Sequence, residues 1–282
     1  MWLSRSIPNL QSHLRSQKAN GATIAFVPTM GALHEGHLSL IRRAGRESDI
    51  SVCSIFVNPT QFNNPGDLEK YPRTVETDLQ KLIEVGADYL FMPEVSEIYP
   101  RGTENPAPID FGILADSMEG TSRPGHFAGM AQVVERLLSI VQPDVLVMGQ
   151  KDLQQCQIVE KLIRVRGLDV KLIVEETVRE ADGLAMASRN VRLSPRGRKH
   201  AVLLSKALRA VTENANPGVS VKELLEIGLG VLNESPIVAV EYFEIRRLEG
   251  LEHVVEIEEG QKYAVLGAAQ FEGVRILDNM IF

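Results

Sequence analysis

The chain has 282 residues, of which 44% are hydrophobic and 24% are charged, a composition typical of a globular protein with a sizeable core. This length suffices for roughly two domains. The formal net charge of −7 argues against broad binding to nucleic acid or to an anionic membrane surface. It leaves room for a local basic pocket that binds a small anionic ligand.

Two features indicate the cellular setting. The two cysteines, Cys53 and Cys156, lie in apolar periodic segments, which predicts buried reduced thiols rather than a disulfide or a metal site. The first residues lack the apolar block of a signal peptide, and no stretch approaches the length of a membrane-spanning helix. We therefore expect a soluble cytoplasmic protein.

The first two thirds of the chain alternate strand-like and helical patterns. Nearly continuous runs of Val, Ile, Leu and Phe predict strands at 23–28, 50–58, 88–93, 144–149 and 170–176. Amphipathic patterns between them predict helices at 35–48, 75–86, 126–142 and 152–166. This alternation predicts an α/β fold with a Rossmann-like, doubly wound parallel sheet.

The pattern changes after about residue 176. A helix is predicted at 194–215, with Ser194 as N-cap and Pro195 in the first turn, and a second near 219–234. The segments "VAVEYFEIRR", "KYAVLGAAQF" and "VRILDNMIF" then read as antiparallel strands. We predict two domains, 1–176 and a smaller C-terminal α+β domain at 177–282. The Pro- and Gly-rich segment 100–110 is predicted to be a surface connection.

Unusual polar clusters follow three of the predicted strands. These are "PTMGALHEGH" (28–37), "NPTQFNNPGD" (58–67) and "GQKDLQQ" (149–155). In open α/β sheets ligands bind outside the carboxyl ends of the strands, where helix N-termini offer unpaired N–H groups. The three clusters should therefore converge on one pocket.

The histidines of the first cluster allow several interpretations. His34 and His37 are three residues apart, so they face one side of a first helical turn. In the H-E-x-x-H pattern of zinc proteases the two histidines are four residues apart, so the spacing found here disfavours a zinc site. The pair could be two solvated histidines, or imidazole donors to a phosphate beside a helix N-terminus.

The other clusters are equally open when each is taken alone. Lys151 suits a phosphate or could be solvated, and Asp152 suits Mg²⁺ or could cap a helix. The loop "READGLAMASRN" (179–190) could be a lid over a triphosphate or a plain linker. Arg73, Arg123 and His126 could be ligands, but each taken alone is interpreted as a surface residue.

Taken together, the segments resemble a known family. "PTMGALHEGH", "SIFVNPTQF", "YPRT", "SRPGHFAGMAQVV", "PDVLVMGQKDLQQ" and "READGLAMASRN" are similar, in order and spacing, to the pantoate–β-alanine ligase (pantothenate synthetase) family of the H-x-G-H nucleotidyltransferase superfamily. The resemblance covers about residues 20–195 and is weaker beyond them. It implies nucleotide and pantoate binding by residues 1–176 and a lid role for residues 177–282.

The resemblance also implies a reaction. Pantoate carboxylate would attack the α-phosphorus of ATP to give pantoyl adenylate and pyrophosphate, and the β-alanine amine would then displace AMP. ATP would be a substrate, with Mg²⁺ as its cofactor, and a homodimer would be expected. Neither step needs a protein nucleophile, so the protein positions groups and stabilises charge.

The family's site residues map onto this chain. His37, His34 and Lys151 would be catalytic, with His37 the proton donor; Gln61 and Gln155 would bind pantoate; Asp78 and Asp152 would lie near Mg²⁺. ATP would contact Met30, Gly31, Ala32, Leu33, His34, Glu35, Gly36, His37, Gly149, Gln150, Lys151, Asp152, Val178, Met186, Ala187, Ser188 and Arg189.

Two positions depart from the family pattern. Ala187 replaces a common serine, which removes one hydroxyl worth about 0.5–1.5 kcal/mol and should alter ATP affinity at most. Gln150 replaces a frequent glutamate. Other functions stay open: a different adenylyl or cytidylyl transferase, a non-catalytic nucleotide sensor, or a zinc hydrolase.

Overall fold

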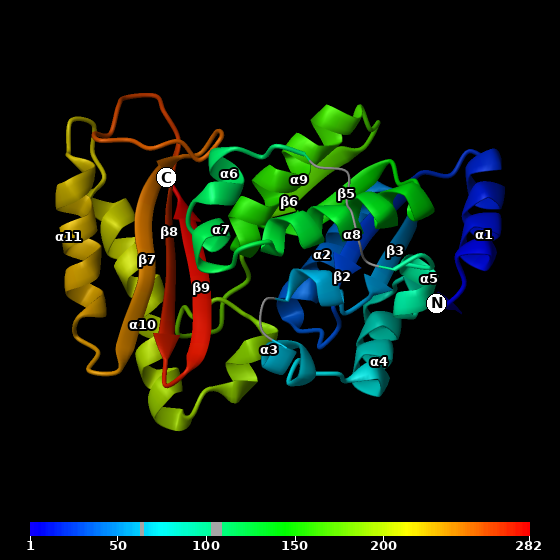
Figure 1. Cartoon of the computed structure of the whole chain (residues 1–282), viewed down its shortest axis with the longest axis horizontal. Helices are drawn as coiled ribbons and strands as arrows, with labels where there is room; N and C mark the ends of the chain where they lie inside the picture. Colours follow the sequence, from blue (N-terminus) through cyan, green and yellow to red (C-terminus); the bar gives the residue numbers. More distant parts are fainter. Residues whose placement is uncertain (63–64, 103–108) are drawn as a thin grey trace.

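The N-terminal part of the chain forms a six-stranded parallel sheet with the strand order β1-β4-β3-β2-β5-β6 (Figure 1). The computed structural model describes residues 1–62, 65–102 and 109–282. The strands are β1 (Trp2–Ser4), β2 (Ile24–Thr29), β3 (Ile50–Ile55), β4 (Tyr89–Phe91), β5 (Val145–Gly149) and β6 (Lys171–Glu175). The five predicted strands are confirmed. The centre of the predicted surface connection, 103–108, lies outside the described residues.

Helices cover both faces of this sheet. On β2, Ile24 and Phe26 face a cluster that includes side chains of α1, α8 and α9, whereas Ala25 and Val27 face α2 and α4. This is the alternation of a strand buried on both faces, so the sheet is doubly wound. The helices are α1 (Ile7–Ala19), α2 (Glu35–Glu47), α4 (Val75–Val85), α8 (His126–Val141) and α9 (Leu153–Arg166).

The sequence patterns did not predict β1 and α1. β1 has only three residues, and α1 buries only Leu10 and Leu14, so neither has a strong period. Short helical turns also lie between these elements. They are η1 (Pro59–Gln61), α3 (Pro65–Glu69), α5 (Val95–Ile98), α6 (Ile113–Asp116), α7 (Glu119–Ser122), η2 (Gln150–Asp152) and η3 (Ser188–Arg192).

The C-terminal part is a smaller α+β unit, drawn in yellow to red in Figure 1. Its antiparallel sheet has the order β7-β8-β9, and its helices pack on that sheet. As predicted, the Ser194 side chain caps the first helix by accepting the Gly197 N–H. The elements are α10 (Pro195–Asn214), α11 (Val221–Leu232), β7 (Val238–Arg247), β8 (Tyr263–Phe271) and β9 (Val274–Ile281). The predicted fold class is confirmed.

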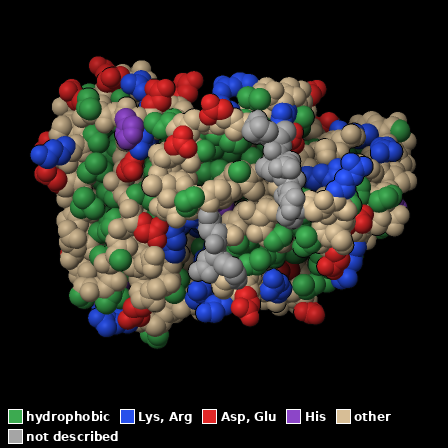
Figure 2. Space-filling model, in the orientation of Figure 1, with side chains coloured by type: hydrophobic (Ala, Val, Ile, Leu, Met, Phe, Trp, Pro, Cys, Tyr) green, Lys and Arg blue, Asp and Glu red, His purple; other side chains and the backbone are tan. Residues whose placement is uncertain are grey.

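The predicted boundary after residue 176 falls just past the end of β6 at Glu175 and stays a prediction. Cys53 and Cys156 are both buried and free. Among the described residues no helix has the length and hydropathy that a membrane span requires. Acidic and basic side chains are interspersed over the face shown in Figure 2.

Candidate functional site

A cavity of about 1100 Å³ opens beyond the carboxyl ends of β2 and β5. The strand order reverses between these two neighbours, and such a switch point is where open α/β sheets bind ligands. Both parts of the chain contribute to its wall. The predicted site residues that line it are Met30, His34, Gly36, His37, Gln61, Gly149, Lys151, Asp152, Gln155, Val178, Met186, Ala187, Ser188 and Arg189. Gly31, Ala32, Leu33, Glu35, Gln150 and Asp78 are not among the lining residues.

Asp78 shapes the loop that leads from β2 into α2. Its two carboxylate oxygens accept the N–H groups of Ala32 and Leu33, each at 2.8 Å, and its side chain is almost fully buried. Gly31 has a φ of +79°, and a Cβ there would lie 3.2 Å from an Asp78 oxygen. Because its two oxygens accept backbone N–H groups, Asp78 holds this loop in shape, and its assignment as a carboxylate near Mg²⁺ stays a prediction.

His34 and His37 lie in the cavity wall at the start of α2, with ring centroids 4.1 Å apart. The His34 backbone N–H donates to His37 Nδ1 at 3.3 Å, so the proton of a neutral His37 is on Nε2. A Cβ on Gly36 would lie 2.9 Å from the His34 ring, so glycine at this position makes room for that ring. Both side chains are partly buried in the cavity wall rather than fully exposed to solvent.

The two imidazoles are neutral at physiological pH. Burial, followed by the charges of Lys151 and Lys81, lowers the pKa of His34 to about 4. Burial, followed by His34 and Lys151, lowers the pKa of His37 well below its usual range. A neutral imidazole with its proton on Nε2 is a hydrogen-bond donor to a phosphate oxygen, and negative charge placed beside it would raise its pKa.

Gln61 is fixed through both its side chain and its backbone. Its Oε1 accepts from Asn58 Nδ2 at 3.2 Å, and its Nε2 lies 3.2 Å from the Met30 sulfur. Its carbonyl oxygen accepts from His126 Nδ1 at 2.8 Å and from Arg123 Nη2 at 3.3 Å. His126 is only 5% exposed and both residues line the cavity, so their interpretation as surface residues is wrong. Exposed Arg73 does lie on the surface.

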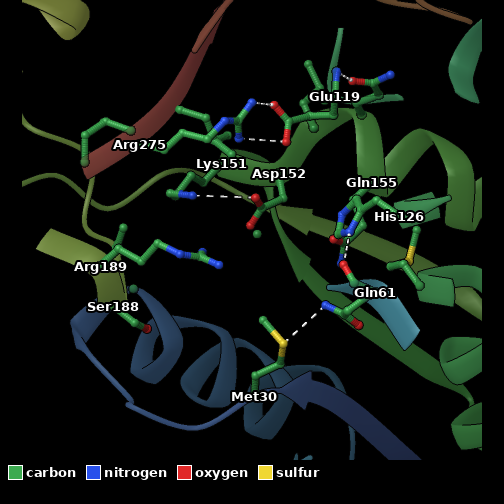
Figure 3. Close-up of a pocket in the computed structure, with 18 of the residues that line it drawn as sticks. Met30, Gln61, Glu119, His126, Lys151, Asp152, Gln155, Ser188, Arg189 and Arg275 are labelled. Atoms are coloured by element: carbon green, nitrogen blue, oxygen red, sulfur yellow. Dashed lines mark hydrogen bonds and ion pairs between the residues drawn. The ribbon is translucent and has the colours of Figure 1, made fainter. Parts of the chain in front are cut away.

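The turn after β5 presents Lys151 and Asp152 to the cavity, opposite Gln61, His126 and Gln155 (Figure 3). The Lys151 and Asp152 side chains are 3.5 Å apart and are 20% and 50% exposed. Asp152 occupies the N-cap position of α9, but its side chain makes no capping hydrogen bond. The carboxylate is therefore available to a cation in the cavity, and the ammonium to an anion.

The 179–190 loop is a tight hairpin that reaches the first cluster. The Met186 N–H donates to the Val178 carbonyl at 3.0 Å, and the Ser188 hydroxyl donates to the Ala32 carbonyl at 3.0 Å. Arg189 lies over the Tyr71 ring, 5.5 Å from its centroid, and lines the cavity. The loop is thus part of the site rather than a plain linker.

Two polar residues of β9 hold the site together, and sequence reasoning missed them. The Asp278 carboxylate accepts two hydrogen bonds from Arg179, at 2.6 and 3.0 Å. Asn279 Nδ2 donates to the carbonyls of Gln150 and Lys151, at 2.8 and 2.9 Å. The signal was present, because "DN" interrupts the apolar strand "VRILDNMIF".

A buried carboxylate, Glu119, joins the two parts of the chain at the rim of the cavity. Arg275 of β9 donates to both Glu119 oxygens, one of them at 3.0 Å, and Tyr242 of β7 donates at 2.9 Å. Burial would raise the pKa of Glu119, but the Arg275 hydrogen bonds and charge hold it below its usual value. Glu119 therefore remains ionised, and its charge is balanced by Arg275.

The arrangement offers donors for a polyphosphate on one side and amide groups for a small hydroxy acid on the other. Among the described residues no group of three or more His, Cys, Asp or Glu could hold a metal ion. Mg²⁺ is usually bound through one or two carboxylates together with substrate phosphates, so the assignment of Asp152 near Mg²⁺ stays a prediction.

Comparison with known proteins is consistent over the whole chain. A family profile described as pantoate-beta-alanine ligase matches residues 3–281. The pantothenate synthetase of Cytophaga hutchinsonii is 43% identical over 98% of this chain and 97% of its own. The crystal structure of pantothenate synthetase from Thermus thermophilus is 41% identical, with a TM-score of 0.92 over 99% of both chains.

A third relative was solved with ligands. The pantoate-beta-alanine ligase of Francisella tularensis, complexed with beta-gamma ATP and beta-alanine, is 33% identical, with a TM-score of 0.81 over 100% of this chain and 97% of that one. The resemblance first drawn from six motifs is thus confirmed. This chain belongs to the pantoate–β-alanine ligase family.

Proposed function

We propose that this protein condenses (R)-pantoate with β-alanine to form pantothenate, through a pantoyl-adenylate intermediate that is made from ATP. The observation that carries the proposal is the cavity itself. It brings the amide side chains of Gln61 and Gln155 to the same space as His37, Lys151 and Arg189. Family membership supports the reaction as a whole, and the cavity supplies groups suited to pantoate and to ATP.

In the first step a pantoate carboxylate oxygen attacks the α-phosphorus, and the bond between that phosphorus and the oxygen of the β-phosphate breaks. Pyrophosphate leaves with the electron pair. Negative charge builds up on the phosphoryl oxygens, and preorganised donors stabilise it. His37 Nε2–H and the Lys151 ammonium are the donors in the wall, with Arg189 on the hairpin. Mg²⁺, held at Asp152, would neutralise further phosphate charge.

Gln61 and Gln155 orient pantoate for this attack. An amide can donate to a carboxylate and accept from a hydroxyl, which are the two groups that pantoate presents. Because Asn58 holds the Gln61 Oε1, the Nε2 donor faces Met30 and the cavity. Fixed donors of this kind raise the rate by holding the reacting atoms in line.

In the second step the β-alanine amine attacks the acyl carbon. The bond from that carbon to the phosphate oxygen breaks, AMP leaves with the electron pair, and the proton that the amine loses as the amide forms passes to solvent. The adenylate must survive until the amine arrives. The Ser188 bond to Ala32 supports a closed hairpin that keeps water away from it.

The decisive experiment is pantoate-dependent exchange of labelled pyrophosphate into ATP, followed by product analysis with β-alanine. We expect exchange only with pantoate present, and AMP and pantothenate in equal amounts once β-alanine is added. Exchange without pantoate would indicate another adenylyl transferase. ATP binding without exchange would indicate a nucleotide sensor, and turnover that requires stoichiometric zinc would indicate a hydrolase. Each of these results contradicts the proposal.

We also propose that the protein is a homodimer. Symmetric dimers are the commonest oligomers, and the family resemblance carries the same expectation. Light scattering on the purified chain measures this directly, and a mass near the 31.2 kDa of one chain would contradict it.

A further inference from the structure

Gln61 lies on a turn of only one short helical segment, so contacts with other parts of the chain help to fix its position. The 3-10 turn η1 contains only three residues, Pro59–Gln61. Its first residue is a proline without an N–H group, and its local hydrogen bonds run from the Phe62 N–H to the Pro59 carbonyl and from the Thr60 N–H to the Asn58 side chain. Neither of these bonds involves Gln61, whose orientation depends on Asn58 Nδ2 and on contacts from other elements.

Two such contacts meet at the carbonyl oxygen of Gln61. His126 Nδ1 donates to this oxygen at 2.8 Å, and Arg123 Nη2 donates to it at 3.3 Å. A third contact joins the two donors, because Arg123 Nη1 lies 3.2 Å from His126 Nε2. Together the three contacts close a triangle on one backbone atom.

The protonation of His126 makes these contacts mutually consistent. Burial, followed by the charge of Arg123, lowers the pKa of His126 to about 4, so the ring is neutral at pH 7. A neutral ring that donates from Nδ1 has a lone pair on Nε2, and that lone pair accepts from Arg123. Protonation of Nε2 would place two donors face to face.

The two donors, Arg123 and His126, are themselves held by larger elements. His126 is the first residue of the 16-residue helix α8 and is 5% exposed. Arg123 lies 3.6 Å from the Glu119 carboxylate, which is itself bound by Arg275 of the second sheet. Restraint from these larger elements therefore reaches η1 through two side chains.

We propose that Arg123 and His126 are positioning residues that clamp the Gln61 backbone, so that its side-chain amide is held ready for the carboxylate or hydroxyl of pantoate. This inference rests on the proposed function, because it names how one substrate-binding residue of that site is oriented. His126 acts through Gln61 and need not contact the substrate. The clamp should therefore affect pantoate recognition far more than nucleotide binding.

The test begins with His126→Ala and His126→Asn, with His253→Ala at an exposed histidine as the matched control. The asparagine amide nitrogen takes the place of the imidazole Nδ1. We expect the alanine variant to raise the KM for pantoate about three- to tenfold, the value of one hydrogen bond, and to change the KM for ATP less than about twofold. The asparagine variant should recover most of the loss.

A double-mutant cycle separates positioning from direct contact. In a Gln61→Ala background the backbone carbonyl remains but the side-chain amide is gone, so His126→Ala should have almost no further effect on the KM for pantoate. Additive effects would show that His126 contacts the substrate itself and would overturn the proposal. An unchanged KM for pantoate in the single His126→Ala variant would overturn it as well.

A second pair of variants tests the hydrogen bond from Arg123 to the same oxygen. It is needed if alanine at the buried position 126 unfolds the chain. Arg123→Gln should raise the KM for pantoate, whereas Arg136→Gln, at an exposed position of α8, should not. Equal behaviour of the two would overturn the clamp. The wild-type assay is read first: no pantoate-dependent turnover there would defeat the proposed function itself, whereas turnover with unaffected variants would defeat only the clamp.

Discussion

At the residue scale, the chemistry of the cavity depends on imidazoles that are neutral but well oriented. The backbone N–H of His34 occupies Nδ1 of His37, which leaves the Nε2 proton for a ligand. Neither imidazole carries a buried charge before the substrate arrives, so the resting protein avoids that desolvation penalty. The hydrogen bond from His37 Nε2 to a phosphate oxygen becomes strongest when negative charge develops on that oxygen in the transition state. Stabilisation of the transition state accelerates the reaction.

His37→Ala tests this donor. We expect the rate of adenylate formation to fall about 10²- to 10³-fold, the usual effect of removing one preorganised donor. His37→Gln should retain part of the rate, because its amide N–H reaches the place of Nε2. The measurement is single-turnover pyrophosphate release with saturating ATP and pantoate. An unchanged rate in the alanine variant, with the wild-type Tm, would contradict the role.

The pH dependence of stability follows from the same burial. The pKa values of His34 and His126 are both lowered from 6.5 to about 4 in the folded chain. Between these pH values the unfolded chain binds more protons than the folded chain. The contribution of each histidine to the free energy of unfolding is therefore complete above pH 6.5 and is lost as the pH drops towards 4. Each histidine contributes at most about 1.4 kcal/mol per pH unit.

Urea unfolding from pH 7.5 to 4.5 at constant ionic strength measures this slope. His34→Gln should make the slope shallower by up to one proton, because one of the displaced titrations is gone. A free energy of unfolding that stays flat across this range would contradict the burial of neutral imidazoles.

Residue identity was predictable where a motif carried chemistry and not where a side chain served another residue. The motif led to His37, Gln61 and Lys151, which line the cavity as expected. It did not lead to the structural role of Asp78, because two backbone N–H groups 45 and 46 residues away satisfy that carboxylate. Such pairings arise only when the chain folds.

At the element scale, the sequence predicted long elements well because burial imposes a strong period. Helix α8 was expected at 126–142 and runs from His126 to Val141, with eleven of its residues buried. β1 escaped prediction because it has three residues, and pairing with β4 rather than local preference makes it a strand. The hydrophobic period of a segment shows which of its faces is buried, but not which other element packs against that face.

The close approach of α8 to η1 gives a prediction at this scale. A Cβ on Gly129 would lie 2.3 Å from the Thr60 carbonyl oxygen, so Gly129→Ala must push the helix away from the turn. We expect a loss of about 1–3 kcal/mol in the free energy of unfolding, as in other overpacked sites. The KM for pantoate should also rise, because Gln61 belongs to that turn.

Gly45→Ala on α2 is the matched control for this overpacking. Nothing lies within 4 Å of the Cβ position there, so the higher helix propensity of alanine should add about 0.5–1 kcal/mol to the free energy of unfolding. Urea denaturation of both variants measures the pair. Equal effects of the two substitutions would contradict the packing explanation.

At the scale of the whole molecule, the small sheet serves as part of the proposed nucleotide site. Asp278 holds the hairpin through Arg179, and Asn279 holds the turn that carries Lys151. Arg275, on the same strand, binds Glu119 on α7. One strand of the C-terminal sheet therefore bonds to three segments around the cavity, and a movement of that sheet would move all three.

Asn279→Ala tests this coupling, because it removes the donor to the Gln150 and Lys151 carbonyls. Such a loss costs about 1–3 kcal/mol, so we expect the Kd for ATP to rise about tenfold while the KM for pantoate changes little. Calorimetric titration of ATP measures the first value and steady-state kinetics the second. Asn233→Ala, at an exposed position that ends α11, is the matched control and should bind ATP like the wild type. If Asn279→Ala kept the wild-type affinity for ATP, or weakened the binding of ATP and pantoate equally, the small sheet would support the fold rather than form part of the nucleotide site.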